Sequence, residues 1–345
     1  MLPADSYERV RRLMRRDTGI VISVYFPEGL NVQKGRELLH DTVRMYCEQV
    51  DDPASICLSV DGEQCGADIV ETLAKTYRVS WCVSAVNRGK LQGAAQGVRR
   101  LLDQKTWKYL AVVDQDGDHF GNELMNFVRA AHHIQNWKGT DQLLILGRRM
   151  SRHRPMGFLR GELEELCDRM LLDALMYHAV ITGRPLALEF ANMVDEFPDF
   201  HSGYKLFSAP TAEAVFLKPP HVMELSETCY YRHACEAVMV VEALEHGALL
   251  GVVNRSTLNE QPISTFGMLN RIQLVADMMI WPCRRLAIPL PFVQQWLANH
   301  ISRLLLNTFS PDGKAELEHI RQTVIRTLAE APDLEVEPLA QPLFV

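Results

Sequence analysis

Short apolar runs alternate with longer segments of helical spacing through the N-terminal half of the chain. The run Gly19–Tyr25 (G-I-V-I-S-V-Y) is apolar and β-branched, which is typical of a strand buried on both faces. Further strands are predicted at Ser55–Val60, Val79–Ser84, Tyr109–Val113 and Leu143–Leu146. Helices are predicted between them, at about Arg36–Val50, Ala67–Thr76 and Gly89–Leu102. This alternation predicts an α/β fold with a mostly parallel, Rossmann-like sheet and helices on its faces.

The pattern changes after Leu146. The following segments are a basic stretch at Arg148–Arg160, a predicted long helix at Glu162–Val180, a turn-rich stretch at Pro198–Pro210, a helix at Glu236–His246 and a short strand at Ala248–Val253. From Met268 the spacing is helical, with a break around Pro282–Pro291. We therefore divide the chain into a basic N-terminal helix (1–18), an α/β domain (19–265), a C-terminal helical region (266–330) and a Pro-rich tail (331–345) that we expect to be loose.

Composition narrows the class of protein. The chain has 345 residues, of which 47% are hydrophobic and 23% charged, as in an ordinary soluble globular protein. Its net charge of −7 argues against a general nucleic-acid binder, which needs a basic surplus. No run is apolar enough for a transmembrane helix, because the longest, Ala237–Val253, contains Glu242 and Glu245. The 8 cysteines form no C-x-x-C pair and are expected to be reduced, so we expect a cytoplasmic protein.

Two segments have patterns that could fit a contact with a membrane surface or with another protein chain. Arginines alternate with apolar residues between Arg9 and Arg16, which fits either a peripheral contact with anionic lipid or a solvated helix face packed on the domain. The second interpretation is favoured. The apolar stretch Met278–Phe292 fits core packing or a contact between two copies of the chain.

An acidic turn is the sharpest chemical feature. Asp114, Asp116 and Asp118 occupy alternate positions directly after the strand Tyr109–Val113. Three carboxylates gathered at one point are costly unless a cation neutralises them, and Mg²⁺ or Mn²⁺ prefers such oxygen ligands. The alternatives are a solvated acidic turn or a calcium loop. An EF-hand would place a glutamate where this chain has Met125.

A second feature is Asn87-Arg88-Gly89-Lys90, at the start of a predicted helix. A helix N-terminus with a glycine and a cation suits phosphate binding, although an ordinary charged helix cap is an equal alternative. The spacings of a P-loop and of a dinucleotide-binding G-x-G-x-x-G loop are absent. The sequence therefore gives no sign of the common nucleoside-triphosphate or NAD sites.

Taken together in their order along the chain, the motifs resemble those of the GT-A glycosyltransferases of family 2. Within that family the resemblance is greatest to the polyprenol-phosphate (dolichol-phosphate) mannosyl- and glucosyltransferases. The family's acidic, N-R-G-K and D-x-D-x-Q-H segments are matched by Asp61, Asn87–Lys90 and Asp114–His119. Its G-S-R and D-x-x-S-G-[FY] segments are matched by Gly147–Arg149 and Asp199–Tyr204. Pro27–Asn31 only approximates the family's P-x-[YF]-N-E, and Asn259–Thr265 lacks the Arg and Lys of its late R-x-x-G-x-S-K.

The resemblance implies a GT-A fold and inverting transfer of a hexose from a UDP- or GDP-sugar to a polyprenol phosphate or a soluble acceptor. The helical spacing from Met268 adds a C-terminal helical extension to that fold. The resemblance also implies that Mg²⁺ or Mn²⁺ is held by Asp114, Asp116 and Asp118, with Asp116, Arg149 and Asp199 as catalytic residues. The remaining substrate-binding positions would be Pro27, Asp61 (nucleotide base), Lys90 (diphosphate), Arg160 (phosphate), and Ser202 and Gly203 (acceptor side).

A hydroxyl acceptor would need a general base, whereas a phosphate acceptor is already anionic. The candidates for that base are Asp199 and Glu236, followed by His201 and His233. Two other functions remain open. A sugar nucleotidyltransferase would carry a Gly-rich loop with Arg and Lys after the first strand, which Tyr25–Asn31 lacks. A non-catalytic relative would bind a sugar nucleotide as a sensor or scaffold.

Overall fold

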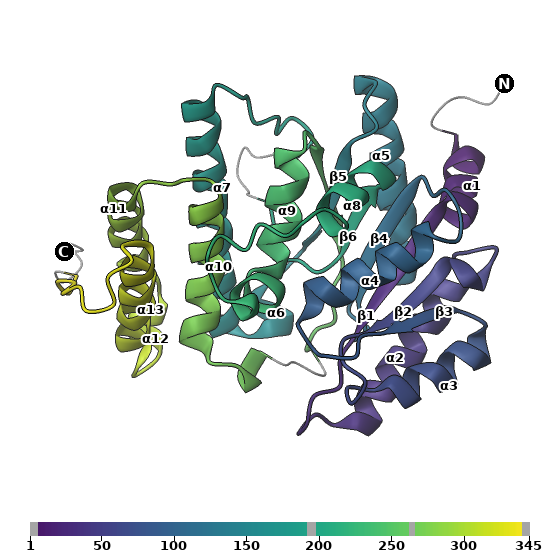
Figure 1. Ribbon diagram of the computed structural model, residues 1–345, viewed down its shortest axis with the longest axis horizontal. Coiled ribbons are helices and arrows are strands. Elements are labelled where there is room, and N and C mark those ends of the chain that lie inside the picture. The colour runs from purple at the N-terminus through teal and green to yellow at the C-terminus, as the bar shows by residue number, and fades with distance from the viewer. Residues whose placement is uncertain (1–5, 192–197, 262–265, 340–345) are drawn as a thin grey trace.

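The computed structural model describes residues 6–191, 198–261 and 266–339 (Figure 1). Within them a seven-stranded sheet has the order β3-β2-β1-β4-β6-β5-β7. The strands are β1 (Thr18–Val24), β2 (Ile56–Val60), β3 (Ser80–Val83), β4 (Tyr109–Asp114), β5 (Leu143–Arg149), β6 (Lys205–Ser208) and β7 (Leu249–Arg255). Only the pairings of β6 with β4 and β5 are antiparallel. The predicted α/β class with a mostly parallel, Rossmann-like sheet is confirmed.

Helices cover both faces of this sheet (Figure 1). One face carries α1 (Tyr7–Asp17), α2 (Val32–Cys47), α3 (Ala67–Tyr77) and α5 (Leu124–Lys138). The core on the other face includes α4 (Lys90–Leu102), α7 (Phe158–Thr182), α8 (Ala209–Phe216) and α9 (Cys235–Glu245). Short turns complete the domain: η1 (Pro53–Ser55), η2 (Gly121–Glu123), α6 (His153–Met156) and the π-helical η3 (Cys229–His233). The parallel strands end at one edge, so the residues that follow them gather there.

The C-terminal helical region begins with η4 (Phe266–Met268) and contains α10 (Arg271–Arg285), α11 (Leu290–Ile301), α12 (Leu306–Phe309) and α13 (Gly313–Leu328). Figure 1 shows α11, α12 and α13 at the end of the molecule away from α2 and α3. The buried Trp281 of α10 belongs to the same core as α4 and α9, which joins this region to the sheet. The predicted break starts later than expected, because α10 contains Pro282. In the described ranges, no helix combines the length and apolar character that crossing a membrane requires.

Two expectations are corrected by the packing. The stretch Pro198–Pro210 contains the strand β6, which the sequence pattern did not predict. The first residue of β6, Lys205, is fully buried, and a charged residue at this position does not fit the apolar pattern of a buried strand. Residues 331–339 are not a loose tail. Leu334, Val336 and Leu339 pack against the core, and Arg326 Nε donates to the Leu334 carbonyl at 3.0 Å. Residues 340–345 lie outside the described ranges.

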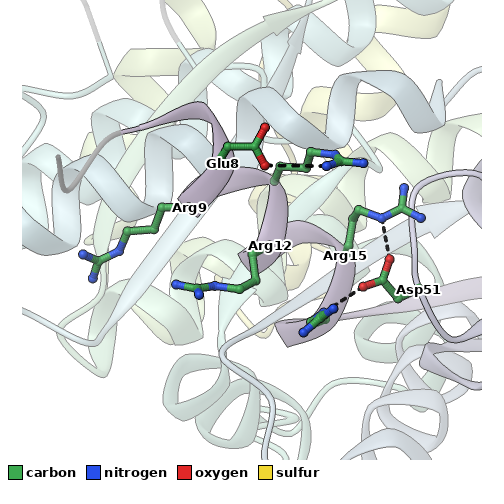
Figure 2. Close-up of a pocket in the computed structure, with 7 residues that line it drawn as sticks. Glu8, Arg9, Arg12, Arg15 and Asp51 are labelled. Atoms are coloured by element: carbon green, nitrogen blue, oxygen red, sulfur yellow. Dashed lines mark hydrogen bonds and ion pairs between the residues drawn. The ribbon is translucent and has the colours of Figure 1, made fainter. Parts of the chain in front are cut away.

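The basic helix α1 packs on the domain. Its Val10, Leu13 and Met14 are buried, so the apolar side of α1 is used in the core rather than offered to a lipid layer. Figure 2 shows Arg9 and Arg12 extending from the helix, while Arg15 turns to Asp51. The Arg15 Nε–Asp51 Oδ1 distance is 2.6 Å. These contacts match the favoured prediction of a solvated helix face packed on the domain.

Close packing of α4 on the sheet depends on a glycine. A Cβ built on Gly97 would lie 2.4 Å from Val21 Cγ1 of β1 and 3.2 Å from Ser59 Cβ of β2. One turn earlier, a Cβ on Gly93 would lie 3.5 Å from Asp61 Cβ, which is an ordinary contact. Gly97 therefore lets α4 approach the two strands whose ends carry the candidate site.

We predict that Gly97→Ala destabilises the protein by about 1–2 kcal/mol, because overpacking outweighs the roughly 1 kcal/mol by which alanine favours a helix. Gly93→Ala is the matched control on the same helix and should leave the free energy of unfolding unchanged or increase it. Denaturant unfolding of the two variants measures both effects. Equal stability of the two would contradict this account of the packing.

Candidate functional site

A cavity of about 320 Å³ lies where the parallel strands end. Its lining includes residues at or just beyond the ends of β1, β2, β4, β5 and β7. Most residues predicted from the sequence line it: Asp61, Lys90, Asp114, Asp116, Asp118, Arg149, Arg160 and Gly203. Pro27, Asp199 and Ser202 are not in its lining. The tertiary structure thus brings together segments that are far apart in the sequence.

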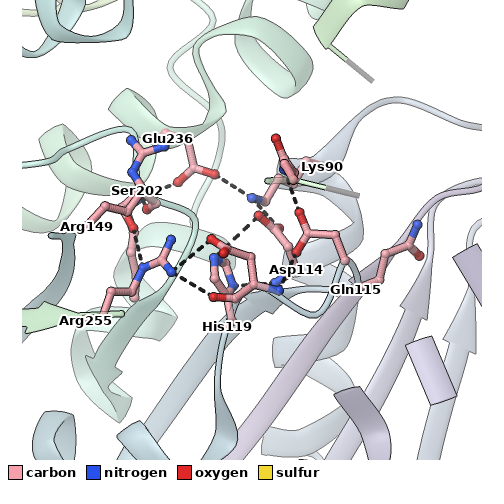
Figure 3. Close-up of polar contacts among 12 residues, drawn as sticks. Lys90, Asp114, Gln115, His119, Arg149, Ser202, Glu236 and Arg255 are labelled. Atoms are coloured by element: carbon pink, nitrogen blue, oxygen red, sulfur yellow. Dashed lines mark hydrogen bonds and ion pairs between the residues drawn. The ribbon is translucent and has the colours of Figure 1, made fainter. Parts of the chain in front are cut away.

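Lys90 is at the centre of the polar contacts. Its Nζ lies 2.5 Å from Asp114 Oδ1 and 2.6 Å from Glu236 Oε1, so the ammonium joins the start of α4, the end of β4 and the start of α9 (Figure 3). Burial by itself would lower the pKa of Lys90, but the two carboxylates hold it above its ordinary value. Likewise, burial would raise the pKa of Asp114, and Lys90 outweighs this and lowers it. Both groups are therefore charged at neutral pH.

Gly203 leaves room for this ion pair. A Cβ at position 203 would lie 2.3 Å from Asp114 Oδ2 and 2.9 Å from Lys90 Nζ. The segment before β6 therefore passes directly against the pair, and any side chain at this position would displace one of the charged groups. This contact gives a steric reason for the glycine that the sequence analysis placed on the acceptor side.

Asp116 is a carboxylate of the cavity whose negative charge is not balanced by an ion pair with any described residue. Burial, followed by the carboxylate of Asp114, raises the pKa of Asp116 to about 6. Its Oδ2 accepts a hydrogen bond from Gln261 Nε2 at 2.8 Å, and no ion pair reaches it from the described residues. A partly buried carboxylate beside another carboxylate is the arrangement that a cation would relieve.

Asp118 departs from the predicted trio of metal ligands. Its Oδ2 lies 3.1 Å from Arg255 Nη1, and its Oδ1 accepts the backbone N–H of Leu258 at 2.6 Å. Both oxygens are committed to the protein, and in the described ranges no three His, Cys, Asp or Glu side chains converge as a ready metal site. Mg²⁺ usually binds one or two carboxylates together with substrate phosphates. Asp116 with Asp114 fits that smaller donor set.

Asp61, which the resemblance assigns to the nucleotide base, is hydrogen-bonded to the backbone of the turn before α4. Its Oδ1 accepts the N–H of Arg88 at 3.0 Å and its Oδ2 that of Gly89 at 2.6 Å. Gly89 has a φ of +133°, and a Cβ there would lie 2.5 Å from the Tyr231 carbonyl oxygen. Asp61 therefore fixes the turn that leads into α4 and positions Lys90, while it still lines the cavity.

Arg149, which lines the cavity, and Asp199, which does not, form a buried ion pair. Arg149 Nε donates to Asp199 Oδ2 at 2.7 Å, and Arg149 Nη2 lies 2.5 Å from Asp199 Oδ1 and 2.8 Å from Glu164 Oε2. Asp199 is fully buried, and although burial would raise its pKa, Arg149 lowers it below the ordinary value. A group held in this way is poorly placed to take a proton from a substrate, so the pair positions the end of β5.

The other candidate bases line the cavity, each with a partner. Glu236 accepts from Lys90 and also contacts the ammonium of Lys205. His201 Nδ1 lies 2.7 Å from Asp168 Oδ1, and His233 Nδ1 lies 2.6 Å from Asp277 Oδ2. The site therefore contains two histidine–aspartate pairs.

Sequence reasoning missed several polar residues of the cavity, among them Arg232, Arg255 and Gln261. Arg232 Nη2 donates to Asn87 Oδ1 at 2.7 Å, which braces the turn before α4. Gln261 bridges Asp116 and Arg160, with its Oε1 accepting from Arg160 Nη1 at 2.7 Å. It lies in the late segment Asn259–Thr265, of which residues 262–265 are outside the described ranges. Arg255 comes shortly after the predicted strand Ala248–Val253, and this position after a strand is the feature from which it could have been predicted as a site residue.

The lining is polar at the strand ends and apolar beyond them. Among the described residues it has six Asp or Glu and five Lys or Arg side chains. Ser202 lies behind the cavity, fully buried, where its hydroxyl accepts from Arg255 Nε at 3.3 Å. The apolar residues come from the short helix α6 and the C-terminal helical region: Pro155, Met156, Phe266, Leu269, Leu274 and Met278.

Comparisons with known proteins give little further information. No protein-family model and no curated protein matches the sequence. Among solved structures, the chain is similar to the crystal structure of S. aureus TarS 1-349, with 11% identity and a TM-score of 0.39 over 91% of this chain and 92% of that one. We therefore base the proposed function on the sequence motifs and the residues of the cavity.

We predict that Asp116→Asn stabilises the protein at pH 7 by about 1–2 kcal/mol, because a carboxyl whose pKa is raised from 3.8 to about 6 is ionised at a cost in the folded state. The gain should decrease as the pH falls through about 6, be mostly lost at pH 4, and vanish well below pH 3.8, where the group is protonated in both states. Unfolding at pH 4 and pH 7 measures this difference. Asp51→Asn is a control of opposite sign, since Arg16 and Arg15 lower the pKa of Asp51. A stabilising gain that is equal at both pH values would count against a buried charge at Asp116.

Proposed function

We propose that this protein is a metal-dependent, inverting glycosyltransferase that takes a hexose from a UDP- or GDP-sugar. The observation that supports this most directly is the Lys90–Asp114 pair beside the uncompensated Asp116, inside a cavity at the strand ends. Ligands of parallel α/β sheets bind at this edge. The motif resemblance gives the reaction class, and the geometry is consistent with the donor half of that reaction.

The charges of the lining favour a donor that arrives with a cation. The described lining has six acidic and five basic side chains, so without a cation it offers an anionic diphosphate no net positive charge. Asp116, together with Asp114, would hold Mg²⁺ or Mn²⁺ against the diphosphate. A bound divalent cation supplies Lewis-acid stabilisation of the negative charge that develops on the leaving diphosphate.

The protein groups have separate tasks in this proposal. Lys90 places a fixed positive charge beside the diphosphate, held in position by Asp114 and Glu236. Asp61 holds the turn before α4, where a nucleotide base would enter. Gly203 lets the backbone before β6 approach the reacting sugar. Water is limited by the apolar wall that includes Phe266 and Met278.

We predict that a matching nucleotide sugar with Mn²⁺ raises the melting temperature of the wild-type protein by several degrees, as tight binding to the folded state requires. A screen of UDP-glucose, UDP-galactose, UDP-N-acetylglucosamine and GDP-mannose, with and without Mn²⁺, measures the shift. Asp116→Asn should lose the Mn²⁺-dependent part, and Asp68→Asn on the exposed side of α3 should keep it.

The screen and two turnover assays, one with a nucleoside triphosphate and one with the nucleotide sugars, separate the proposal from its alternatives. No shift with any nucleotide sugar in the wild-type protein would contradict the proposal. Release of pyrophosphate from a nucleoside triphosphate would favour a nucleotidyltransferase. Binding without hydrolysis or transfer would favour a non-catalytic sensor or scaffold.

The proposal also predicts a pH dependence. Asp116 must be ionised to hold the cation, so Mn²⁺-dependent binding of the nucleotide should weaken as the pH falls, with a midpoint at or below about pH 6. Titration calorimetry with UDP or GDP and Mn²⁺ between pH 5 and pH 8 measures this. Binding of constant strength across that range would argue against Asp116 as the ligand.

A further inference from the structure

The side of the cavity next to β5 holds a network of matched charges. Three arginines and three carboxylates take part, in the ion pairs Arg149–Asp199 (2.5 Å), Arg149–Glu164 (2.8 Å), Arg160–Glu164 (2.7 Å) and Arg152–Asp168 (3.1 Å). Glu164, Asp168 and Asp199 are buried. Because each arginine is matched by an acid, this side offers no surplus of positive charge to an anionic acceptor.

His201 adjoins this network and lines the cavity. Asp168 Oδ1 accepts both from the His201 backbone N–H, at 3.1 Å, and from the ring, whose Nδ1 is 2.7 Å away. The His201 side chain is 2% exposed. Its Nε2 is buried and forms no hydrogen bond with any described residue. The ring is thus fixed by one nitrogen, and its other nitrogen lacks a partner.

This arrangement determines what the free nitrogen can do. Since Asp168 is a carboxylate, His201 Nδ1 donates to it, and in the neutral ring Nε2 is then a hydrogen-bond acceptor. A buried acceptor without a donor is costly, and each one in a folded protein needs an explanation. A ligand hydroxyl in the cavity would supply the missing donor.

The position of His201 in the chain places it close to the donor half of the site. It precedes Gly203 by two residues, and the backbone at Gly203 passes directly against Asp114 and Lys90. His233 also pairs with an aspartate, Asp277, but its ring has no buried nitrogen without a partner. The missing donor therefore distinguishes His201 from His233.

We propose that the acceptor is a neutral hydroxyl compound, such as a sugar or polyol, and that His201 is the general base that removes its proton. This inference rests on the proposed glycosyl transfer. The hydroxyl oxygen attacks the anomeric carbon, and its proton moves to His201 Nε2. The bond from that carbon to the diphosphate oxygen breaks, and its electron pair stays on the leaving nucleoside diphosphate. Asp168 positions the ring and stabilises the positive charge that it gains.

The experiment uses water as the acceptor, because donor hydrolysis needs the same proton transfer. The full chain is incubated with Mn²⁺ and the nucleotide sugar that gives the largest melting shift, and release of the nucleoside diphosphate is followed. His201→Gln should lower kcat by about 100-fold or more and keep the donor-induced melting shift. Asp168→Asn should also lower kcat at an unchanged KM for the donor, because the ring loses the partner that sets its tautomer.

His221→Gln is the matched control, since His221 pairs with Glu242 at 3.0 Å and is not in the lining of the cavity. It should hydrolyse the donor at the wild-type rate. Hydrolysis by His201→Gln at the wild-type rate would overturn the inference and leave the proposed function intact. Loss of the donor-induced shift in both His201→Gln and Asp168→Asn would assign the pair a structural role and likewise overturn it. A wild-type protein that neither binds nor hydrolyses any donor would refute the proposed function, and the inference with it.

Discussion

The ion pairs of Lys90 with Asp114 and Glu236 are the interaction on which the rest of the site depends. They join α4, β4 and α9, which come from distant parts of the chain, at one point beside the strand ends. The side chains of Lys90 and Asp114 are 23% and 30% exposed, so removing one partner should cost less than the roughly 3–5 kcal/mol of a fully buried pair, although it still leaves a charge without compensation. Two neighbouring residues support these ion pairs. Asp61 fixes the turn that presents Lys90, and Gly203 leaves the space that Lys90 and Asp114 occupy.

Charged side chains are balanced on the β5 side of the cavity and unbalanced on the β4 side, which suggests that the two sides bind different parts of the substrates. Close to β5, arginines and carboxylates neutralise one another and hold the backbone in place. Close to β4, Asp116 remains a carboxylate among carboxylates, with its pKa raised to about 6. Strongly shifted pKa values cluster at functional sites, where a ligand can compensate for an unfavourable charge. We therefore associate the β4 side with a cation and a diphosphate, and the β5 side with a neutral acceptor.

The fold also shows how a short, reversed strand can build a site. β6 runs antiparallel between β4 and β5, so its first residue, Lys205, lies at the same edge as the ends of the parallel strands. The segment that leads into it carries His201, Ser202 and Gly203. The ammonium of Lys205 contacts Glu236, which in turn contacts Lys90. The reversed strand thereby brings the predicted acceptor segment against the predicted donor segment.

The sequence by itself determined the α/β class and the strands whose ends carry Asp61 and Asp114, because buried parallel strands are continuous apolar runs that a single chain reveals. Most of the site residues that it predicted also line the cavity. It did not determine which carboxylates are free, since that depends on partners far away in the chain. Arg255 binds Asp118, and Arg149 binds Asp199, whereas Asp116 receives no such cation from the described residues. Nor could local spacing reveal that Asp168 fixes His201 by one nitrogen, because a helix and a loop 33 residues apart meet only in the folded core. Local pattern encodes burial and element type, but the charge state of a buried group is a property of its neighbours in space, and the tertiary structure alone decides those.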